Sequence, residues 1–162
     1  MKHVRRWTIP VFAVVSLLTL AVSAVTMSGQ TAAPADALVG AWRVTEIGDG
    51  SAPPAAASQP GLYVFTRRHY SFARINGAKP LPDYPSNDKA TDADKVAVFN
   101  ALYLNTGTYA VSGNTLSTKA MVAKSAFAIG GAGNRYTFSV TGTTLVLTQQ
   151  PGGAVIKLTR LE

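Results

Sequence analysis

From residue 38 onward the chain is a succession of about eight short runs rich in β-branched and aromatic residues, separated by Gly, Pro, Asn and Asp. This spacing is typical of an all-β barrel or sandwich. Ser112-Gly113-Asn114 and Thr141-Gly142 contain residues that tolerate positive φ, so they predict antiparallel hairpins. The predicted strands are Leu38–Ile47, Gly61–Thr66, His69–Asn76, Gly107–Ser112, Thr115–Met121, Arg135–Val140, Thr143–Gln149 and Ala154–Leu161.

Residues 1–24 read as a signal peptide. Lys2, Arg5 and Arg6 precede an apolar stretch, and Val22-Ser23-Ala24 offers a small-residue cleavage site. The Ala/Pro/Ser/Thr-rich residues 25–37 then predict a disordered tether, followed by one barrel domain over residues 38–162. We therefore expect an exported protein, periplasmic or secreted, with no stable membrane insertion after leader cleavage. An uncleaved membrane anchor is the alternative, since the apolar stretch comes close to the roughly 20 residues that span a bilayer.

Composition narrows the classes of partner. The chain has no cysteine, which excludes both a disulfide framework and a lipid-modified N-terminal Cys. The formal net charge of +7 includes three leader cations, and their removal leaves +4. The remaining cations are scattered, with only Arg67-Arg68 adjacent, so nucleic acid is not an expected partner. The oligomeric state does not follow from the sequence.

Two segments interrupt the strand pattern. Gly48–Pro60 is a Pro/Ala/Ser-rich loop that we expect to lie across a barrel mouth. A second proline-rich loop, 78–90, leads to Thr91, a good N-cap. Apolar residues then recur at helical spacing, which predicts one amphipathic helix over about 92–104 that packs on or plugs the barrel. Its apolar face would consist of Val96, Phe99, Leu102 and Tyr103.

Alternation within the strands assigns side chains to faces. Trp42, Val44 and Glu46 share one face of the first strand, and Arg74 shares a face with the aromatic residues of the third. If Trp42 points inward, Glu46 does too. An inward Glu46 and an inward Arg74 would be costly unless they pair with each other or meet a polar ligand.

Several motifs in order give the chain a recognisable pattern. They are Gly40-Ala41-Trp42, the segment Pro60–Thr66, His69-Tyr70-Ser71 with Arg74 after it, Gly107-Thr108-Tyr109, and Arg160 near the C-terminus. With these motifs the chain resembles the bacterial lipocalin-like domain family, within the calycin group of up-and-down barrels. The resemblance implies an all-β fold with one helix, an antiparallel barrel of about eight strands.

The resemblance also implies how such a barrel is closed. Trp42 of the Gly-x-Trp element would seal one end, the late Arg160 would lie against it, and Gly40 would permit the close backbone approach. The chain departs from typical lipocalins in its mid-chain helix, in the Arg67-Arg68 pair at a hairpin tip, and in its lack of cysteine.

An eight-stranded barrel either fills its interior with side chains or holds one small ligand. Our leading expectation is a non-enzymatic protein that binds a small hydrophobic molecule in the lumen, with aromatic walls and a Glu46/Arg74 polar handle. A self-filled core is the alternative. The candidate ligand-binding residues are Val44, Glu46, Tyr63, Phe65, Tyr70, Phe72, Arg74, Tyr109, Tyr136 and Phe138.

Two further functional classes stay open. A barrel enzyme of isomerase or cyclase type would use Glu46, Tyr70 or His69 for proton transfer. A structural or interaction module of the envelope would use the Arg67-Arg68 tip on acidic surfaces. We assign no catalytic residue and expect no cofactor.

Metal and phosphate sites are also not expected. His69 is the one histidine left after the leader, which disfavours a multi-His metal site or a catalytic triad. Asp88, Asp92 and Asp94 lack the ordered frame of a calcium loop and read as acids near a helix start. The glycine-rich segment 130–133 lacks the Lys-Ser/Thr of a phosphate loop and reads as a flexible turn.

Overall fold

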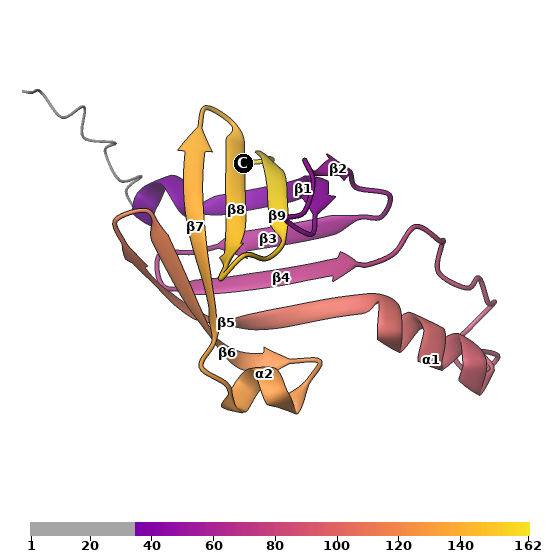
Figure 1. Cartoon of the computed structure of the whole chain (residues 1–162). Helices are drawn as coiled ribbons and strands as arrows, with labels where there is room; N and C mark the ends of the chain where they lie inside the picture. The colour runs from indigo at the N-terminus through magenta and orange to yellow at the C-terminus, as the bar shows by residue number, and fades with distance from the viewer. Residues whose placement is uncertain (1–34) are drawn as a thin grey trace, which may run out of the picture. The chain divides into compact units, whose positions relative to one another are not determined.

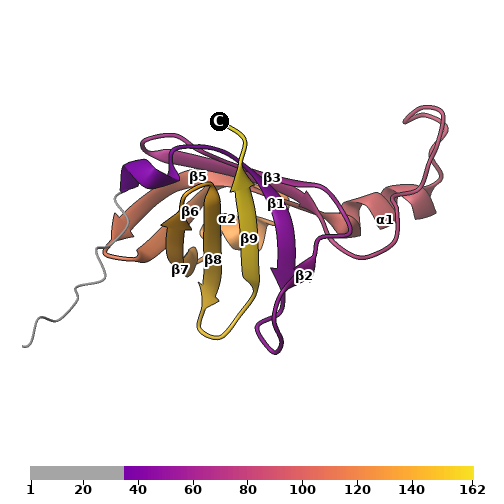
Figure 2. The same ribbon diagram turned by 90° about the horizontal axis from the view of Figure 1, so that it is seen from above.

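The computed structural model describes residues 35–162, so the expected signal peptide and the tether up to residue 34 lie outside the described residues. The described part is a closed antiparallel barrel of eight strands with one additional short strand (Figures 1 and 2), which confirms the all-β class. The elements are η1 (Ala35–Leu38), β1 (Gly40–Gly48), β2 (Ala55–Ala56), β3 (Gly61–Phe65), β4 (His69–Ile75), α1 (Asp92–Ala101), β5 (Leu102–Ser112), β6 (Thr115–Ala123), α2 (Ala126–Gly130), β7 (Asn134–Thr141), β8 (Thr144–Gln150) and β9 (Val155–Arg160).

The barrel strands pair in chain order, and β1 closes the sheet. Trp42 of β1 faces Tyr63 of β3 on one side and Arg160 of β9 on the other. Closure removes the unpaired edges that an open sheet would expose, while β2 merely adds two residues beside β1. Both expected hairpins are present, with Gly113 at φ 59° and Gly142 at φ 57°.

One end of the barrel is packed shut, and we call it the closed base. Trp42, Leu116, Leu145 and Leu158 have no exposed surface there or in the adjoining core. Complete burial of such side chains contributes about 1.5–3 kcal/mol each. The indole Nε1 of Trp42 donates to the carbonyl of Leu38 at 2.8 Å, so η1 is fixed across this end.

The opposite end of the barrel, which we call the open end, carries the longer connections. In an up-and-down barrel, alternate connections lie at the same end. The loop containing β2, the connection containing α1 and the connection containing α2 therefore all leave the barrel at the open end, where Ile47, Arg74 and Tyr103 lie on the strands.

A β-bulge in β1 reverses the expected side-chain alternation. Val44 pairs with Leu158, but the next pair is Glu46 with Lys157, so Thr45 is an extra residue in β1. After the bulge Ile47 packs against the core. Glu46 instead forms an ion pair with Lys157 at 2.8 Å, with about a third of its side chain exposed. The expectation of an inward Glu46 is therefore wrong.

The mid-chain helix differs from expectation in length and in packing. α1 ends at Ala101, and Leu102 and Tyr103 begin β5 instead of continuing the helix. No residue of α1 is buried, and the helix projects away from the barrel (Figures 1 and 2). The expectation that it packs on or plugs the barrel is therefore wrong.

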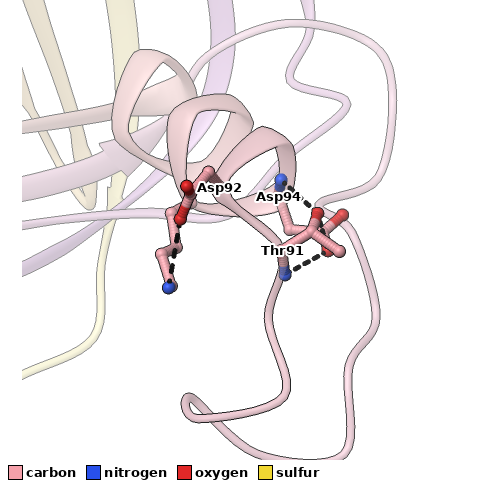
Figure 3. A network of polar contacts seen from close by, with 4 residues as sticks. Thr91, Asp92 and Asp94 are labelled. Carbon is pink, nitrogen blue, oxygen red and sulfur yellow. Dashed lines mark hydrogen bonds and ion pairs between the residues drawn. The ribbon is translucent and has the colours of Figure 1, made fainter.

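The start of α1 is held by a capping box. The Thr91 hydroxyl accepts from the Asp94 N–H, and the Asp94 carboxylate accepts from the Thr91 N–H and hydroxyl (Figure 3). These hydrogen bonds lower the pKa of Asp94. Lys95 pairs with Asp92 at 3.4 Å on the exposed surface. Local hydrogen bonds therefore fix the N-terminus of a helix that has little support from the barrel.

A second short helix, α2, occupies the segment just before the glycine-rich turn. It lies against β6, and Gly133 follows it at φ 83°. A Cβ at Gly133 would come within 2.0 Å of the Thr118 carbonyl oxygen. This glycine therefore permits the segment to approach β6 closely, a packing role beyond that of a flexible turn.

Candidate binding site

The three residues expected at the closed base lie together as a structural seal. The Arg160 guanidinium lies 4.0 Å from the centroid of the Trp42 ring and donates to the carbonyls of Ala37 and Val39 at 2.6 Å each. Gly40 has φ 135°, and a Cβ there would come within 2.3 Å of the Glu162 carbonyl oxygen. Both hydrogen bonds of the Arg160 guanidinium go to carbonyls of this chain, so this end of the barrel has a structural role, which is to keep the barrel closed.

Most of the expected ligand-binding side chains pack against one another inside the barrel. Tyr63 and Phe72 stack with ring centroids 4.8 Å apart, and Phe65 meets Tyr109 edge to face at 5.5 Å. Tyr109 is partly buried against this cluster. Those fully within the core are Val44, Tyr63, Phe65, Tyr70, Phe72, Tyr136 and Phe138. These aromatic side chains thus form the core of the barrel and the floor beneath its open end.

A pocket of about 260 Å³ lies above that floor at the open end. Its barrel-side wall consists of Tyr70, Tyr103, Asn105, Thr118 and Ala120 from three adjacent strands. The facing wall comes from α2, the following turn and the first residue of β7, with Phe127, Ala128, Gly131, Ala132, Gly133 and Asn134. The connection between β6 and β7 therefore forms one side of an accessible cavity.

The pocket has a polar group at its floor. The Tyr70 hydroxyl donates to Oδ1 of the buried Asn105. Burial raises the pKa of Tyr70, and a hydrogen bond with Thr118 opposes part of that rise. At neutral pH the floor therefore presents neutral hydroxyl and amide groups among apolar walls.

Tyr70 is the one residue of the barrel-side wall that the sequence pattern predicts as ligand-binding, whereas Tyr103, Asn105, Thr118 and Ala120 are not predicted. The sequence pattern places Tyr103 in the helix and leaves Asn105 just before the strand that it predicts from Gly107 onward. Alternation through Leu104 and Thr106 could have placed Tyr103 and Asn105 on the inward face. Thr118 carries no comparable signal, since a threonine in a strand suits either face.

Arg74 lies on the inward face of β4 at the open end, in line with Tyr70 and Phe72. Its guanidinium lies 4.9 Å from the centroid of the Tyr103 ring. Its Nε and Nη1 atoms are buried and have no hydrogen-bond partner among residues 35–162. Leaving a buried donor unpaired costs about 1–3 kcal/mol, and more for a charged group. The expected pairing with Glu46 is absent because the bulge turns Glu46 outward.

The tyrosines around Arg74 stay protonated at neutral pH. Burial raises the pKa of Tyr63 to about 12, with the nearby Arg74 charge opposing the rise. Burial also raises the pKa of Tyr136, as does the proximity of Tyr63 and Tyr103, while Arg74 again opposes the rise. These hydroxyls therefore do not neutralise the guanidinium.

A second hollow, of about 380 Å³, lies on the outer face of the barrel. Leu62 and Ala73 line it from β3 and β4, and they face away from the interior because their neighbours Tyr63 and Phe72 point inward. Its other walls include Arg43, Arg74, Leu102 and Leu161. This outer groove is larger and more apolar than the pocket at the open end, but the barrel encloses it on one side only.

The remaining candidates lie apart from both hollows. His69 is exposed at the start of β4, and Arg67 and Arg68 are exposed in the turn before it. Within the described residues, no group of three or more His, Cys, Asp or Glu side chains could hold a metal ion. Among the described helices, none combines the length and the apolarity needed to span a bilayer.

Fold and site together define a closed eight-stranded antiparallel β-barrel with a sealed base and a pocket at the other end. No family model matches the chain, and no curated protein matches it. A solved structure similar to it is that of an uncharacterized protein from Bacteroides eggerthii, with 12% sequence identity and a TM-score of 0.45. The alignment covers 76% of this chain and 98% of that chain. This similarity is too low to indicate a family or a function.

Proposed function

We propose that the protein is an exported, non-enzymatic lipocalin-like barrel that binds a small, mainly hydrophobic molecule at its open end. The observation that carries the proposal is the 260 Å³ pocket between the inward side chains of β4, β5 and β6 and the segment containing α2. Apolar walls with a few convergent polar groups are the usual composition of small-molecule sites. Tyr70, Asn105 and Thr118 are those polar groups here.

Burial of apolar ligand surface can supply useful binding energy. Covering roughly 200 Å² of apolar ligand surface contributes about 5 kcal/mol before the costs of association.

The enzyme alternative depends on Glu46, which pairs with Lys157 on the outer face, and on His69, which is exposed away from the pocket. Neither residue reaches the pocket that contains Tyr70, so no observation favours an isomerase or cyclase.

The test is a screen of apolar fluorescent probes, fatty acids and sterols against protein produced from the full sequence. Two matched variants locate the site. Ala120→Leu narrows the inner pocket, and Ala73→Leu narrows the outer groove. We expect wild type to bind a probe with micromolar or better affinity, Ala120→Leu to lose most of that affinity, and Ala73→Leu to keep it.

A third variant covers the case in which Ala120→Leu does not fold. Phe127 is 88% exposed and lines the pocket, so Phe127→Ala shortens one wall without disturbing the core. We expect it to weaken probe binding several-fold while far-UV circular dichroism stays unchanged. Binding that responds to Ala73→Leu alone would move the site to the outer groove, and no binding of any probe would overturn the proposal.

A further inference from the structure

Arg74 is a partly buried cation on the inward face of β4, and two of its buried nitrogens have unused hydrogen-bonding capacity. Nε and Nη1 lack partners, and the ion pairs formed by the described residues, Lys95 with Asp92 and Lys157 with Glu46, do not include it. Folded proteins pair nearly all buried polar groups, and buried charges most of all. The Nε and Nη1 atoms of Arg74 can therefore donate hydrogen bonds to an acceptor that reaches this end of the barrel.

The surroundings of Arg74 have room for this side chain but give it no counter-charge. Its cross-strand neighbour on β3 is Gly61, where a Cβ would lie only 2.9 Å from the Arg74 Cβ. On β5 its neighbour is Tyr103, whose ring supplies a face for the cation. The nearby hydroxyls of Tyr63 and Tyr136 are neutral donors or acceptors, so they cannot replace an anion.

Tyr103 connects Arg74 with the pocket. It lines the pocket wall, contacts the guanidinium with its ring, and is 38% exposed. Its ring also stacks on Phe72 of the core, with ring centroids 5.4 Å apart. Tyr103 therefore borders both the pocket and the guanidinium.

We infer that the ligand is an apolar molecule with one carboxylate, and that Arg74 binds that carboxylate while the pocket walls hold the hydrocarbon. This inference rests on the proposed function and names its ligand class. One partly buried cation matches one negative charge, and a carboxylate supplies two acceptor oxygens to a guanidinium. The other interior arginine, Arg160, already bonds to the carbonyls of Ala37 and Val39.

The test compares three probes of equal chain length: dodecanoate, dodecanol and dodecylammonium. Calorimetric titration of protein produced from the full sequence, below the micellar concentrations, gives each affinity. We expect dodecanoate to bind at least tenfold more tightly than dodecanol, and dodecylammonium to bind most weakly. Arg74→Gln should lower the dodecanoate affinity tenfold or more and leave the dodecanol affinity within twofold.

Two further variants make the result specific. Arg74→Lys keeps the charge and should retain a preference for dodecanoate over dodecanol. Arg135→Gln removes a cation from the exposed face of β7 and should change none of the three affinities. If Arg74→Gln does not fold, the role of the Arg74 charge is still tested by the wild-type preference for dodecanoate over dodecanol and by its retention in Arg74→Lys.

The outcomes separate this inference from the proposed function. Equal affinities for the three probes, or a dodecanoate preference that Arg135→Gln abolishes as strongly as Arg74→Gln, would overturn the role of Arg74 and leave apolar binding intact. Failure of all three probes to bind would overturn both.

Discussion

At the scale of single residues, Arg160 links the last strand to the start of the domain. Its guanidinium covers the Trp42 ring and bonds to two carbonyls of the segment that precedes β1. Cation–π contact and charge-assisted hydrogen bonds both strengthen as water is excluded. A part-buried side chain with three such contacts therefore carries more stability than a surface arginine.

We expect Arg160→Ala to lower the free energy of unfolding by about 2–4 kcal/mol, because it removes the ring contact and both carbonyl bonds. Arg160→Lys keeps the charge but cannot reach both carbonyls, so its loss should be about half as large. Urea unfolding followed by Trp42 fluorescence measures both. Arg135→Ala, on an exposed strand position, is the control, and an Arg160→Ala effect no larger than its effect would contradict this role.

The raised pKa values of two buried tyrosines predict that the protein loses stability at alkaline pH. Tyr63 has a pKa raised from 10.0 to about 12, so the unfolded chain releases this proton first. Stability from Tyr63 is therefore complete below pH 10 and falls as the pH rises toward 12, by up to about 1.4 kcal/mol per pH unit. Tyr136, whose pKa is also raised, adds to the fall.

Thermal unfolding at pH 8 to 11.5 tests this prediction. The double variant Tyr63→Phe/Tyr136→Phe should show a shallower decline above pH 10, and absorbance at 295 nm should show tyrosine ionisation accompanying unfolding. Tyr84→Phe makes the same chemical change in the loop between β4 and α1. An equal flattening in that control would show that the two core tyrosines are not responsible.

At the scale of elements, sequence reasoning succeeded where period and turn chemistry agreed and failed where one residue changed the register. The hairpins at Gly113 and Gly142 follow from residues that accept positive φ. The bulge at Thr45 has no such marker, so alternation carried Glu46 to the wrong face. Leu102 and Tyr103 fit helical spacing from Phe99 but also fit a strand. They form the start of β5 because they pair with β4.

The candidate site was predictable in part for the same reason. The inward aromatic residues of β3, β4 and β7 followed from alternation and lie in the core. The facing wall of the pocket does not follow from alternation, because α2 and the turn after it are apolar and glycine-rich and show no clear hydrophobic period. Which aromatic residues fill the barrel and which border space depends on how that segment folds back on β6.

The helix α1 should melt locally without unfolding the barrel. Thr91→Ala removes a capping box worth about 1 kcal/mol to the helix, and no residue of α1 is buried to couple that loss to the core. We expect faster amide hydrogen exchange over residues 92–101 and an unchanged melting temperature. Asp88→Ala, outside the box, should change neither. A melting temperature lowered by several degrees would mean that α1 supports the barrel after all.

At the scale of the whole molecule, the first and last segments of the described residues 35–162 meet at the closed base. The Leu161 N–H donates to the Ala41 carbonyl at 2.8 Å, and Arg160 reaches Ala37. These two segments are therefore neighbours in space, and a short linker can join them.

A circular permutant tests this arrangement of the barrel. With a short glycine-serine linker from Glu162 to Ala35 and new ends at Gly142-Thr143, we expect the same β-rich circular dichroism and a stability loss below about 3 kcal/mol. New ends inside β5, between Gly107 and Thr108, should prevent folding, because that strand pairs along its length with β4 and β6. Equal folding of both permutants would contradict the closed pairing.

The extra residue at Thr45 has a consequence for how such barrels diversify. Removing that single residue would place Glu46 directly after Val44, and Glu46 would keep its position opposite Lys157 on the outer face. The strand would then pair regularly, with Ile47 still facing the core. A strand of such a barrel can therefore gain one codon without turning a charged side chain into the interior, because the bulge absorbs the extra residue.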